Sequence, residues 1–272
     1  MLVHSLSLKP DHKNQIVRLL QLTDSHLLEN PNKTFAGVVP YKSLQAVIQH
    51  VTEKQKFDVV VSTGDIAQEG TPSTYQQYFE SVDQLNTPHF YIRGNHDGTS
   101  HFPSQQDKND FEIILIENWC IILLNSQVDA HIYGDLTQSQ LEELNLLLEK
   151  YKTYHVLLAL HHHTFAVGCA WLDQHILKNA DEFLACITPH LNVKAVICGH
   201  VHQDSSFTHQ HIKFLSSPST FVQFKPQSDE FRLDTLPPGY RMLYLHPDGY
   251  VESEVYYLTE NVGNIDHNLS EY

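Results

Sequence analysis

Five short runs of residues that can bind metals or transfer protons recur along the chain, each directly after an apolar stretch. They are Asp24-Ser25-His26, Gly64-Asp65, Gly94-Asn95-His96-Asp97, His161-His162-His163 and Gly199-His200-Val201-His202. Each run alone has an ordinary explanation, because Gly, Asn and Asp are common in turns and a single His at a strand end is often structural. Five such endings in one chain are not explained in this way. We therefore interpret them as one functional cluster.

The ligand chemistry of the cluster suits two metal ions. Two carboxylates, one amide oxygen and four imidazoles are too many for one tetrahedral zinc, and no thiolate accompanies them. Mixed oxygen and imidazole ligands suit Mn, Fe, Co or Zn. Two ions about 3.5–4 Å apart can hold a bridging hydroxide and clamp the oxygens of a phosphoryl group. The five runs therefore favour a dinuclear site for phosphoryl chemistry.

Strand-like stretches alternate with helical segments through the first two-thirds of the chain. Strands are expected at 16–22, 57–63, 89–93, 155–160 and 193–198. Helices are expected at 41–55, from Thr71-Pro72 onward, from the capping-box sequence 137–140 to Lys150, and at 181–187. This alternation indicates an α/β sheet, in which ligands gather at the carboxyl ends of the strands. The five runs all lie at such ends, so we expect them to meet.

The remaining segments predict β structure and a tail. Apolar runs broken at Glu117-Asn118 suggest an antiparallel hairpin within 111–126. The chain after His211 has an all-β pattern, with a hairpin at 247–249. We assign residues 1–260 to a single domain and residues 261–272 to a polar C-terminal tail, which we expect to be loosely held.

Composition limits the partners and the compartment. The net charge of -15 argues against a nucleic-acid polymer as a partner. A small anionic substrate stays compatible, because bound divalent cations would reverse the local field. There is no stretch of about 20 apolar residues, so no membrane span is expected, and residues 1–15 lack the apolar block of a signal peptide. Four cysteines without CxxC spacing indicate reduced core thiols. We expect a cytoplasmic protein, with its oligomeric state open.

In this order, the five runs resemble the sequence blocks of the calcineurin-like metallophosphoesterases, and the resemblance covers most of the chain. It implies an α/β fold in which two mixed β-sheets pack as a sandwich flanked by helices, in αββα layers. It also implies a dinuclear site at one edge. The first metal would be held by Asp24, His26 and His202. The second would be held by Asn95, His161 and His200, and Asp65 would bridge both.

The same resemblance implies roles in catalysis. Asp65 and His96 are the expected catalytic residues, and His96 is similar to a non-ligand His that stands near the leaving-group oxygen. The residues implied to contact substrate are His26, Asp65, Asn95, His96, His161 and His202. In the histidine run, the ligand of the family follows the strand directly, which selects His161. By alternation His163 shares its side and His162 faces away. The family usually continues with proline, whereas this chain has Thr164.

Three stretches outside the five runs, 168–179, 218–226 and 231–240, resemble the bacterial class III 3′,5′-cyclic-AMP phosphodiesterases. Two interpretations of their apolar residues stay open. They either pack a lid against the sheet or form a pocket wall on which an adenine could stack. The residues concerned are Trp171, Leu172, Phe221 and Phe224.

The resemblance implies hydrolysis of 3′,5′-cyclic AMP to 5′-AMP, with a metal-bound hydroxide as nucleophile. The cofactors would be two divalent ions, iron or manganese first and cobalt or zinc as alternatives. The partner would be a small nucleotide substrate. Two alternatives remain: a phosphoesterase of the same superfamily acting on another phosphodiester, a nucleotide-sugar or a phosphomonoester, and a non-catalytic binding scaffold. The scaffold interpretation predicts a lost ligand, and every block position is present.

Overall fold

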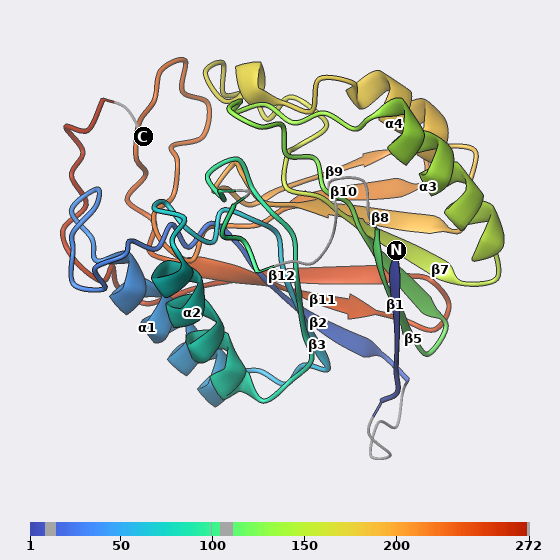
Figure 1. Cartoon of the computed structure of the whole chain (residues 1–272), viewed down its shortest axis with the longest axis horizontal. Coiled ribbons are helices and arrows are strands. Elements are labelled where there is room, and N and C mark those ends of the chain that lie inside the picture. Colours follow the sequence, from blue (N-terminus) through green and yellow to red (C-terminus); the bar gives the residue numbers. More distant parts are fainter. Residues whose placement is uncertain (9–14, 99, 104–110, 271–272) are drawn as a thin grey trace.

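The structure is a computed structural model that describes residues 1–8, 15–98, 100–103 and 111–270. Two β-sheets pack face to face in it (Figure 1). The first has the strand order β1 (Leu2–Leu6), β5 (Glu112–Ile116), β6 (Trp119–Leu123), β7 (His155–Ala159), β8 (Val193–Cys198), β10 (Ile212–Ser216), β9 (Ser205–His209). The second has the order β12 (Val251–Tyr257), β11 (Gly239–Leu245), β2 (Val17–Leu22), β3 (Val59–Ser62), β4 (His89–Tyr91). Each sheet mixes parallel and antiparallel pairs, which confirms the predicted fold class.

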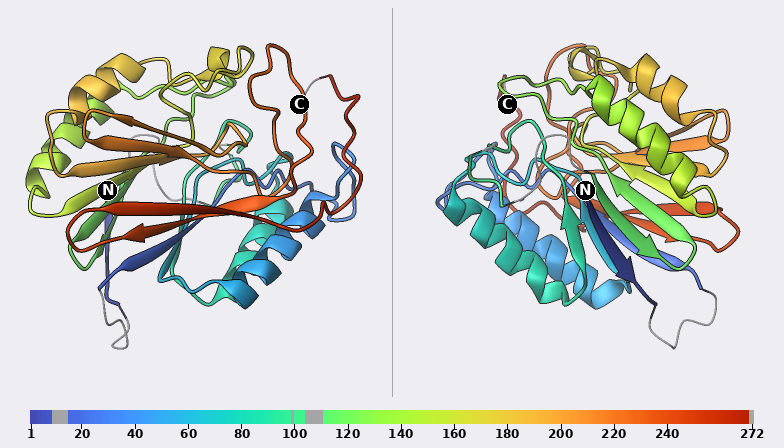
Figure 2. Two further views of the ribbon diagram at one scale, coloured as in Figure 1. Left: turned by 180° about the vertical axis from the view of Figure 1, so that it is seen from behind. Right: turned by 45° about the vertical axis from the view of Figure 1, so that its right-hand side comes forward.

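In the described part of the chain, four α-helices cover the outer faces of the two sheets, with α1 and α2 on one side and α3 and α4 on the other (Figure 2). They are α1 (Pro40–Lys54), α2 (Pro72–Val82), α3 (Gln138–Lys150) and α4 (Ala180–Ile187). The predicted starts of two of them are confirmed. The Thr71 hydroxyl accepts from the Thr74 N–H, and Thr137 and Gln140 form a reciprocal capping box. The layers therefore run helices, sheet, sheet, helices.

Alternation along the strands divides the core into layers. In β2, Leu19 joins the apolar cluster between the two sheets, whereas Leu20 joins the cluster beneath α1 and α2. Val60 and Val61 of β3 divide in the same way. Because both faces of these strands are buried, the strands appear in the sequence as continuous apolar runs. The two sheets are held together by the shared middle layer.

Two terminal segments differ from expectation. Strand β1 was not predicted, and it pairs in parallel with β5 at the edge of the first sheet, where Leu2 and Val3 stay exposed. An edge strand with little burial lacks the apolar pattern that reveals a strand in sequence. Residues 263–270 of the predicted loose tail pack against the loop 36–38. Residues 9–14 of the N-terminal stretch 1–15 and residues 271–272 of the predicted tail lie outside the described residues.

Within the described ranges, each helix is too short or too polar to span a bilayer.

The helix α3 offers a direct test of the layered core. Leu144 is fully buried against the first sheet, whereas Leu146, two residues along the same helix, is 69% exposed. We expect Leu144→Ala to lower the free energy of unfolding by about 2–5 kcal/mol through cavity formation. We expect Leu146→Ala to change it by less than about 0.5 kcal/mol. Urea denaturation of both variants measures the difference, and equal losses would contradict this placement of α3.

Candidate metal centre

The structure brings the five predicted runs together. They follow β2, β3 and β4 of one sheet and β7 and β8 of the other. Several groups of three residues have ligand atoms within 4.8 Å of one another. These groups are Asp24, His26, His202; Asp24, Asp65, His161; His161, His162, His200; and His26, Asp65, His96. Asn95 joins them, because its Oδ1 lies 3.1 Å from His161 Nε2. All seven residues predicted to hold metal are therefore in one cluster.

The backbone turns sharply at most of these residues. Left-handed φ values, which non-glycine residues adopt rarely, occur at Asp24 (54°), His26 (45°), Asp65 (48°), His200 (69°) and His202 (47°). Neighbouring segments hold the turns in place. The Asp24 N–H donates to the Gly64 carbonyl and the His26 N–H to the Asp65 carbonyl, each at 3.0 Å. Strained backbone of this kind marks functional sites, and here it aims side chains from separate strands at one point.

Two glycines allow the runs to approach one another. A Cβ on Gly94 would lie 2.1 Å from Asp65 Oδ1, and a Cβ on Gly199 would lie 2.1 Å from Thr23 Oγ1. Neither space could hold a methyl group without moving a buried polar group. The glycines that precede Asn95 and His200 are thus required by close packing.

Hydrogen bonds to the outer nitrogens orient three of the histidines. His161 Nδ1 donates to the Thr63 carbonyl and His202 Nδ1 to the Val222 carbonyl, each at 2.7 Å. His26 Nδ1 lies 2.8 Å from Gln68 Oε1. These contacts at Nδ1 direct the Nε2 atom of each ring into the cluster.

The Nε2 atoms converge in a way that suits a shared cation. His26 Nε2 and His202 Nε2 lie 3.2 Å apart and form one group with Asp24. His161 Nε2 faces Asp65 Oδ2 at 3.3 Å. The buried His200 Nε2 has no hydrogen-bond partner among the described residues. Oxygen and imidazole donors arranged in this way fit divalent transition metals.

Buried charge supports the same interpretation. Asp24 and Asp65 are both almost inaccessible. Burial opposes ionisation, yet His202 and His161 hold the pKa of the Asp24 carboxyl below its usual range. Burial would also raise the pKa of Asp65, but His161 and His96 hold it well below the usual range of a carboxyl group. Burial would lower the pKa of His161, but the Asp65 carboxylate beside it raises this pKa to about 9. The cluster thus keeps two carboxylates ionised inside the protein.

Asp97, the last residue of its run, supports the others. Its carboxylate accepts from the backbone N–H groups of Gly94 (2.9 Å), Ile66 (3.2 Å) and Ala67 (3.1 Å), and from the Tyr75 hydroxyl (3.3 Å). Burial and the nearby Asp65 raise the pKa of Asp97 to about 7. The side chain therefore ties the turn after β3 to the turn after β4, a role that the sequence did not reveal.

A cavity of about 240 Å3 adjoins the cluster. From the five runs it is lined by His26, Asp65, Asn95, His96, His200 and His202. From outside the runs it is lined by Ile132, Trp171, Leu172, His175, Phe224, Phe231 and Ser270. Of the four aromatic and apolar residues left open above, three therefore form a pocket wall. Phe221 instead packs in the interior, with its ring stacked on Phe35 at 5.7 Å.

Motif reasoning did not identify Ile132 or Ser270. Ile132 is half-exposed in a loop without any motif, and Ser270 lies in the predicted tail. An exposed apolar residue and a single Ser carry no periodic or spacing signal. Their place beside the cavity depends on how the loops fold back over the sheet edge.

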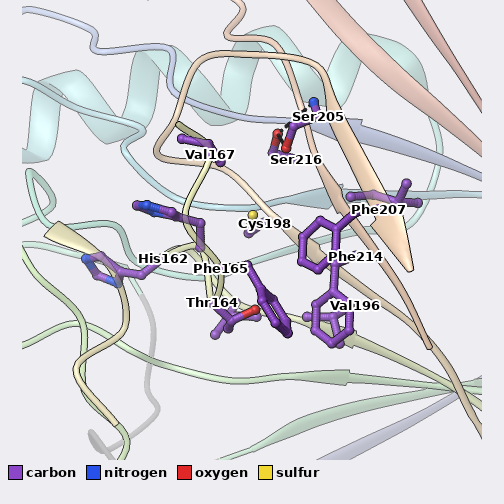
Figure 3. A pocket seen from close by; sticks show the side chains of 13 residues that line it. His162, Thr164, Phe165, Val167, Val196, Cys198, Ser205, Phe207, Phe214 and Ser216 are labelled. Carbon is purple, nitrogen blue, oxygen red and sulfur yellow. Dashed lines mark hydrogen bonds between the residues drawn. The ribbon is translucent and has the colours of Figure 1, made fainter. Parts of the chain in front are cut away.

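The histidine run is divided between different surroundings. His162 does not face away as alternation predicted, because it lies beside His161 and His200 with a ring nitrogen within 4.8 Å of theirs. Its two ring nitrogens contact Ser126 Oγ (2.8 Å, at Nδ1) and the Ile132 carbonyl (3.0 Å, at Nε2). His163 stacks on His200, with ring centroids 5.6 Å apart. Thr164 lines a smaller cavity of about 20 Å3 together with Phe165 and Phe214 (Figure 3). The departure from proline at position 164 thus lies at this smaller cavity and outside the lining of the larger one.

Asp97→Asn tests the supporting role of Asp97. Both carboxylate oxygens accept backbone N–H groups, so an amide would set its own NH2 against a donor and leave buried groups unsatisfied. We expect a stability loss of about 1–3 kcal/mol and a fall in metal affinity of about 10–100-fold. Thermal unfolding and metal titration measure the two effects. Asp83→Asn, at an exposed carboxylate, is the matched control. Equal stability and equal metal affinity in the two variants would show that Asp97 does not support the metal-binding turns.

Comparisons with known proteins agree with this geometry. Residues 17–204 match the calcineurin-like phosphoesterase family. The 3′,5′-cyclic adenosine monophosphate phosphodiesterase CpdA of Vibrio vulnificus is 39% identical over 244 residues, 88% of this chain and 89% of that protein. CpdA of Escherichia coli (strain K12) is 39% identical over 249 residues, 90% of each chain.

A solved structure shows the same fold. The dimetal phosphatase of Danio rerio superimposes with a TM-score of 0.61 at 14% identity, covering 89% of this chain and 98% of that one. With the family match spanning more than half of the residues, and with relatives this similar over most of their length, the chain belongs to the calcineurin-like phosphoesterase family.

Proposed function

We propose that this protein hydrolyses 3′,5′-cyclic AMP to 5′-AMP with the help of two divalent metal ions. The observation that carries the proposal is that ligand-type side chains and a group of aromatic side chains line one cavity. The names of the 39%-identical relatives support cyclic AMP as the substrate. The cavity would then hold the phosphate at the side chains of the five runs. The nucleoside would lie at the aromatic wall, which is formed by Trp171, Phe224 and Phe231.

The residues divide into two ligand groups that share Asp65. Asp24, His26 and His202 would hold one ion, and Asn95, His161 and His200 the other. The position of Asp65 supports a bridging role, since its Oδ2 lies 3.7 Å from His26 Nε2 and 3.3 Å from His161 Nε2. When bound, two divalent ions supply an activated water and positive charge for the phosphoryl oxygens. We expect iron or manganese, with cobalt or zinc as alternatives.

His96 is the proton donor in this proposal. Its backbone N–H donates to Asp65 Oδ1 at 2.8 Å, and its ring stands edge-on to His26 with centroids 4.9 Å apart. The ring lines the cavity, so it can reach a bound ester. A positioned imidazole can donate a proton to the departing 3′-oxygen of the ribose, which avoids expelling an alkoxide.

The aromatic wall offers a surface for the adenine. Trp171 meets Phe224 and Phe231 edge-on, with centroid distances of 5.0 and 5.2 Å. Phe224 stacks on His202 at 4.0 Å, so one of its faces is already covered. The purine would therefore contact Trp171 or Phe231, and stacking of this kind contributes about 1–3 kcal/mol per base. The wall and the ligand groups together fit a nucleotide.

Variants at Asp65 and His96 separate metal binding from catalysis. We expect Asp65→Ala to lose paired metal and turnover together, because the shared carboxylate is removed. We expect His96→Ala to keep its metal and lose turnover by about 10²–10⁴-fold, the usual contribution of a general acid. Elemental analysis beside turnover assays measures both properties. Full metal content with normal activity in Asp65→Ala would refute the ligand assignment.

A substrate panel tests the reaction itself. Metal-free protein would be reconstituted with manganese or iron and given 3′,5′-cyclic AMP, 2′,3′-cyclic AMP, a linear aryl phosphodiester and an aryl phosphomonoester. We expect metal-dependent release of 5′-AMP from the first, in preference to turnover of the other three. Turnover of the linear diester without that of 3′,5′-cyclic AMP would leave a metal-dependent esterase and remove the substrate. Inactivity on all four would favour a binding scaffold.

A further inference from the structure

The segment 263–270 forms a defined contact beside the larger cavity, although its sequence resembles a loose tail. Gly263 pairs with Val38 in an antiparallel bridge, and the Asp266 N–H donates to the Ala36 carbonyl at 3.0 Å. The Leu269 N–H then donates to the Asp266 carbonyl at 3.2 Å, which bends the segment back toward the cavity. The red C-terminal segment accordingly runs beside the blue loop that precedes α1 in Figures 1 and 2.

The fit between the segment and this loop is close. A Cβ on Gly37 would lie 1.9 Å from the Asn264 carbonyl oxygen and 2.7 Å from the Asp266 nitrogen. Gly37 also has a φ of 81°, which disfavours any side chain. The two backbones therefore touch where only glycine can stand, and a residue at position 37 with a side chain would push the segment away.

The segment also packs on the apolar cluster to which the cavity wall belongs. Ile265 and Leu269 contact an apolar cluster that contains Leu172 and Phe224, with Trp171 and Phe231 at its margin. Ser270 itself lines the cavity with these residues. The segment thus joins the cluster that holds the wall through Leu269, and it extends the cavity lining with Ser270.

We propose that residues 263–270 determine the size of the ester that the cavity admits. The inference rests on the proposed function, because it places the scissile phosphate at the ligand groups. A cyclic diester carries both ester oxygens on one nucleoside, whereas a linear diester brings a second organic group that needs its own space. At about 240 Å3, the cavity is smaller than the roughly 300–1,000 Å3 typical of ligand pockets. The segment would therefore select the compact substrate by excluding the larger one.

Shortening the chain after Asn261 tests the proposal, and point variants test it without removing residues. Gly37→Ala displaces the segment by steric conflict, and Leu269→Asp removes its apolar contact with the cluster beside the cavity. His267→Ala is the control, because this side chain is exposed. For each variant, kcat/KM is measured with 3′,5′-cyclic AMP, a linear aryl phosphodiester and an aryl phosphomonoester, together with the metal content.

We expect the ratio of linear-diester to cyclic-AMP turnover to rise roughly tenfold or more in the shortened chain, since the discrimination of a pocket depends on one or two wall contacts. Metal content and monoester turnover should stay as in the full chain. An unchanged ratio would overturn the proposal, as would parallel loss of metal and of all three activities in the shortened chain and both point variants. If only the shortened chain fails to fold, the turnover ratios of Gly37→Ala and Leu269→Asp decide whether the proposal holds.

The two proposals fail in distinguishable ways. If the full chain turns over aryl esters but not cyclic AMP, the substrate is wrong, and the ratio of linear diester to monoester still reports on the segment. Tryptophan fluorescence adds a readout that needs no turnover. The chain has two tryptophans, and Trp119 is fully buried in the core. Acrylamide quenching of Trp171 should therefore increase when the segment is removed or displaced, and unchanged quenching would contradict its place on the wall.

Discussion

The structure depends on electron-rich atoms brought together inside the protein. His26 Nε2 and His202 Nε2 face each other at 3.2 Å beside two buried carboxylates. Imidazole nitrogens and carboxylate oxygens this close together are the donor set that divalent transition metals require. Here it is maintained by left-handed backbone at the ligand residues and by carbonyls that hold the imidazoles at their outer nitrogens. The protein thus prepares the site before any ion arrives, so little reorganisation remains on binding.

The same region joins the two sheets. The backbone N–H of His200, which follows β8 of the first sheet, donates to the carboxylate of Asp24, which follows β2 of the second, at 3.1 Å. Nearby, Gln21 Nε2 in β2 donates at 3.0 Å to the carbonyl of Cys198 in β8. Buried polar groups must be satisfied, and here they satisfy one another across the sandwich. Ligand geometry and sheet packing are therefore coupled, and a change in one would disturb the other.

Chemistry and selectivity come from different parts of the chain. The ligand groups and His96 lie directly after strands, where backbone position is determined by the sheet. The wall comes from loops, with Trp171, Phe231 and Ser270 contributed by three separate segments. One ligand cluster can serve many phosphate esters, whereas a wall made of loops can change with little effect on the fold. Under our proposal, the substrate preference of this protein therefore lies in its loops and its C-terminal segment.

The sequence by itself determined the features that depend on neighbouring residues. Apolar runs, the caps at Thr71 and Thr137, and the ligand residues after each strand were all visible, because periodicity and capping act over a few positions. The expectation that the runs would meet followed from strand order in α/β sheets. The domain boundary at residue 260 stays a prediction.

Only the tertiary structure decided which atoms those residues present. The carbonyls of Thr63 and Val222, 98 and 20 positions from their histidines, determine which ring nitrogens face the cluster. Phe221 is turned into the interior while Phe224 lines the cavity, and the segment 263–270 docks beside the loop at Gly37. These outcomes depend on contacts between distant segments, whose energies exist only once the whole chain has packed. Local pattern therefore showed where the chemistry lies, and long-range packing decided the orientation of its groups and the shape of the pocket around them.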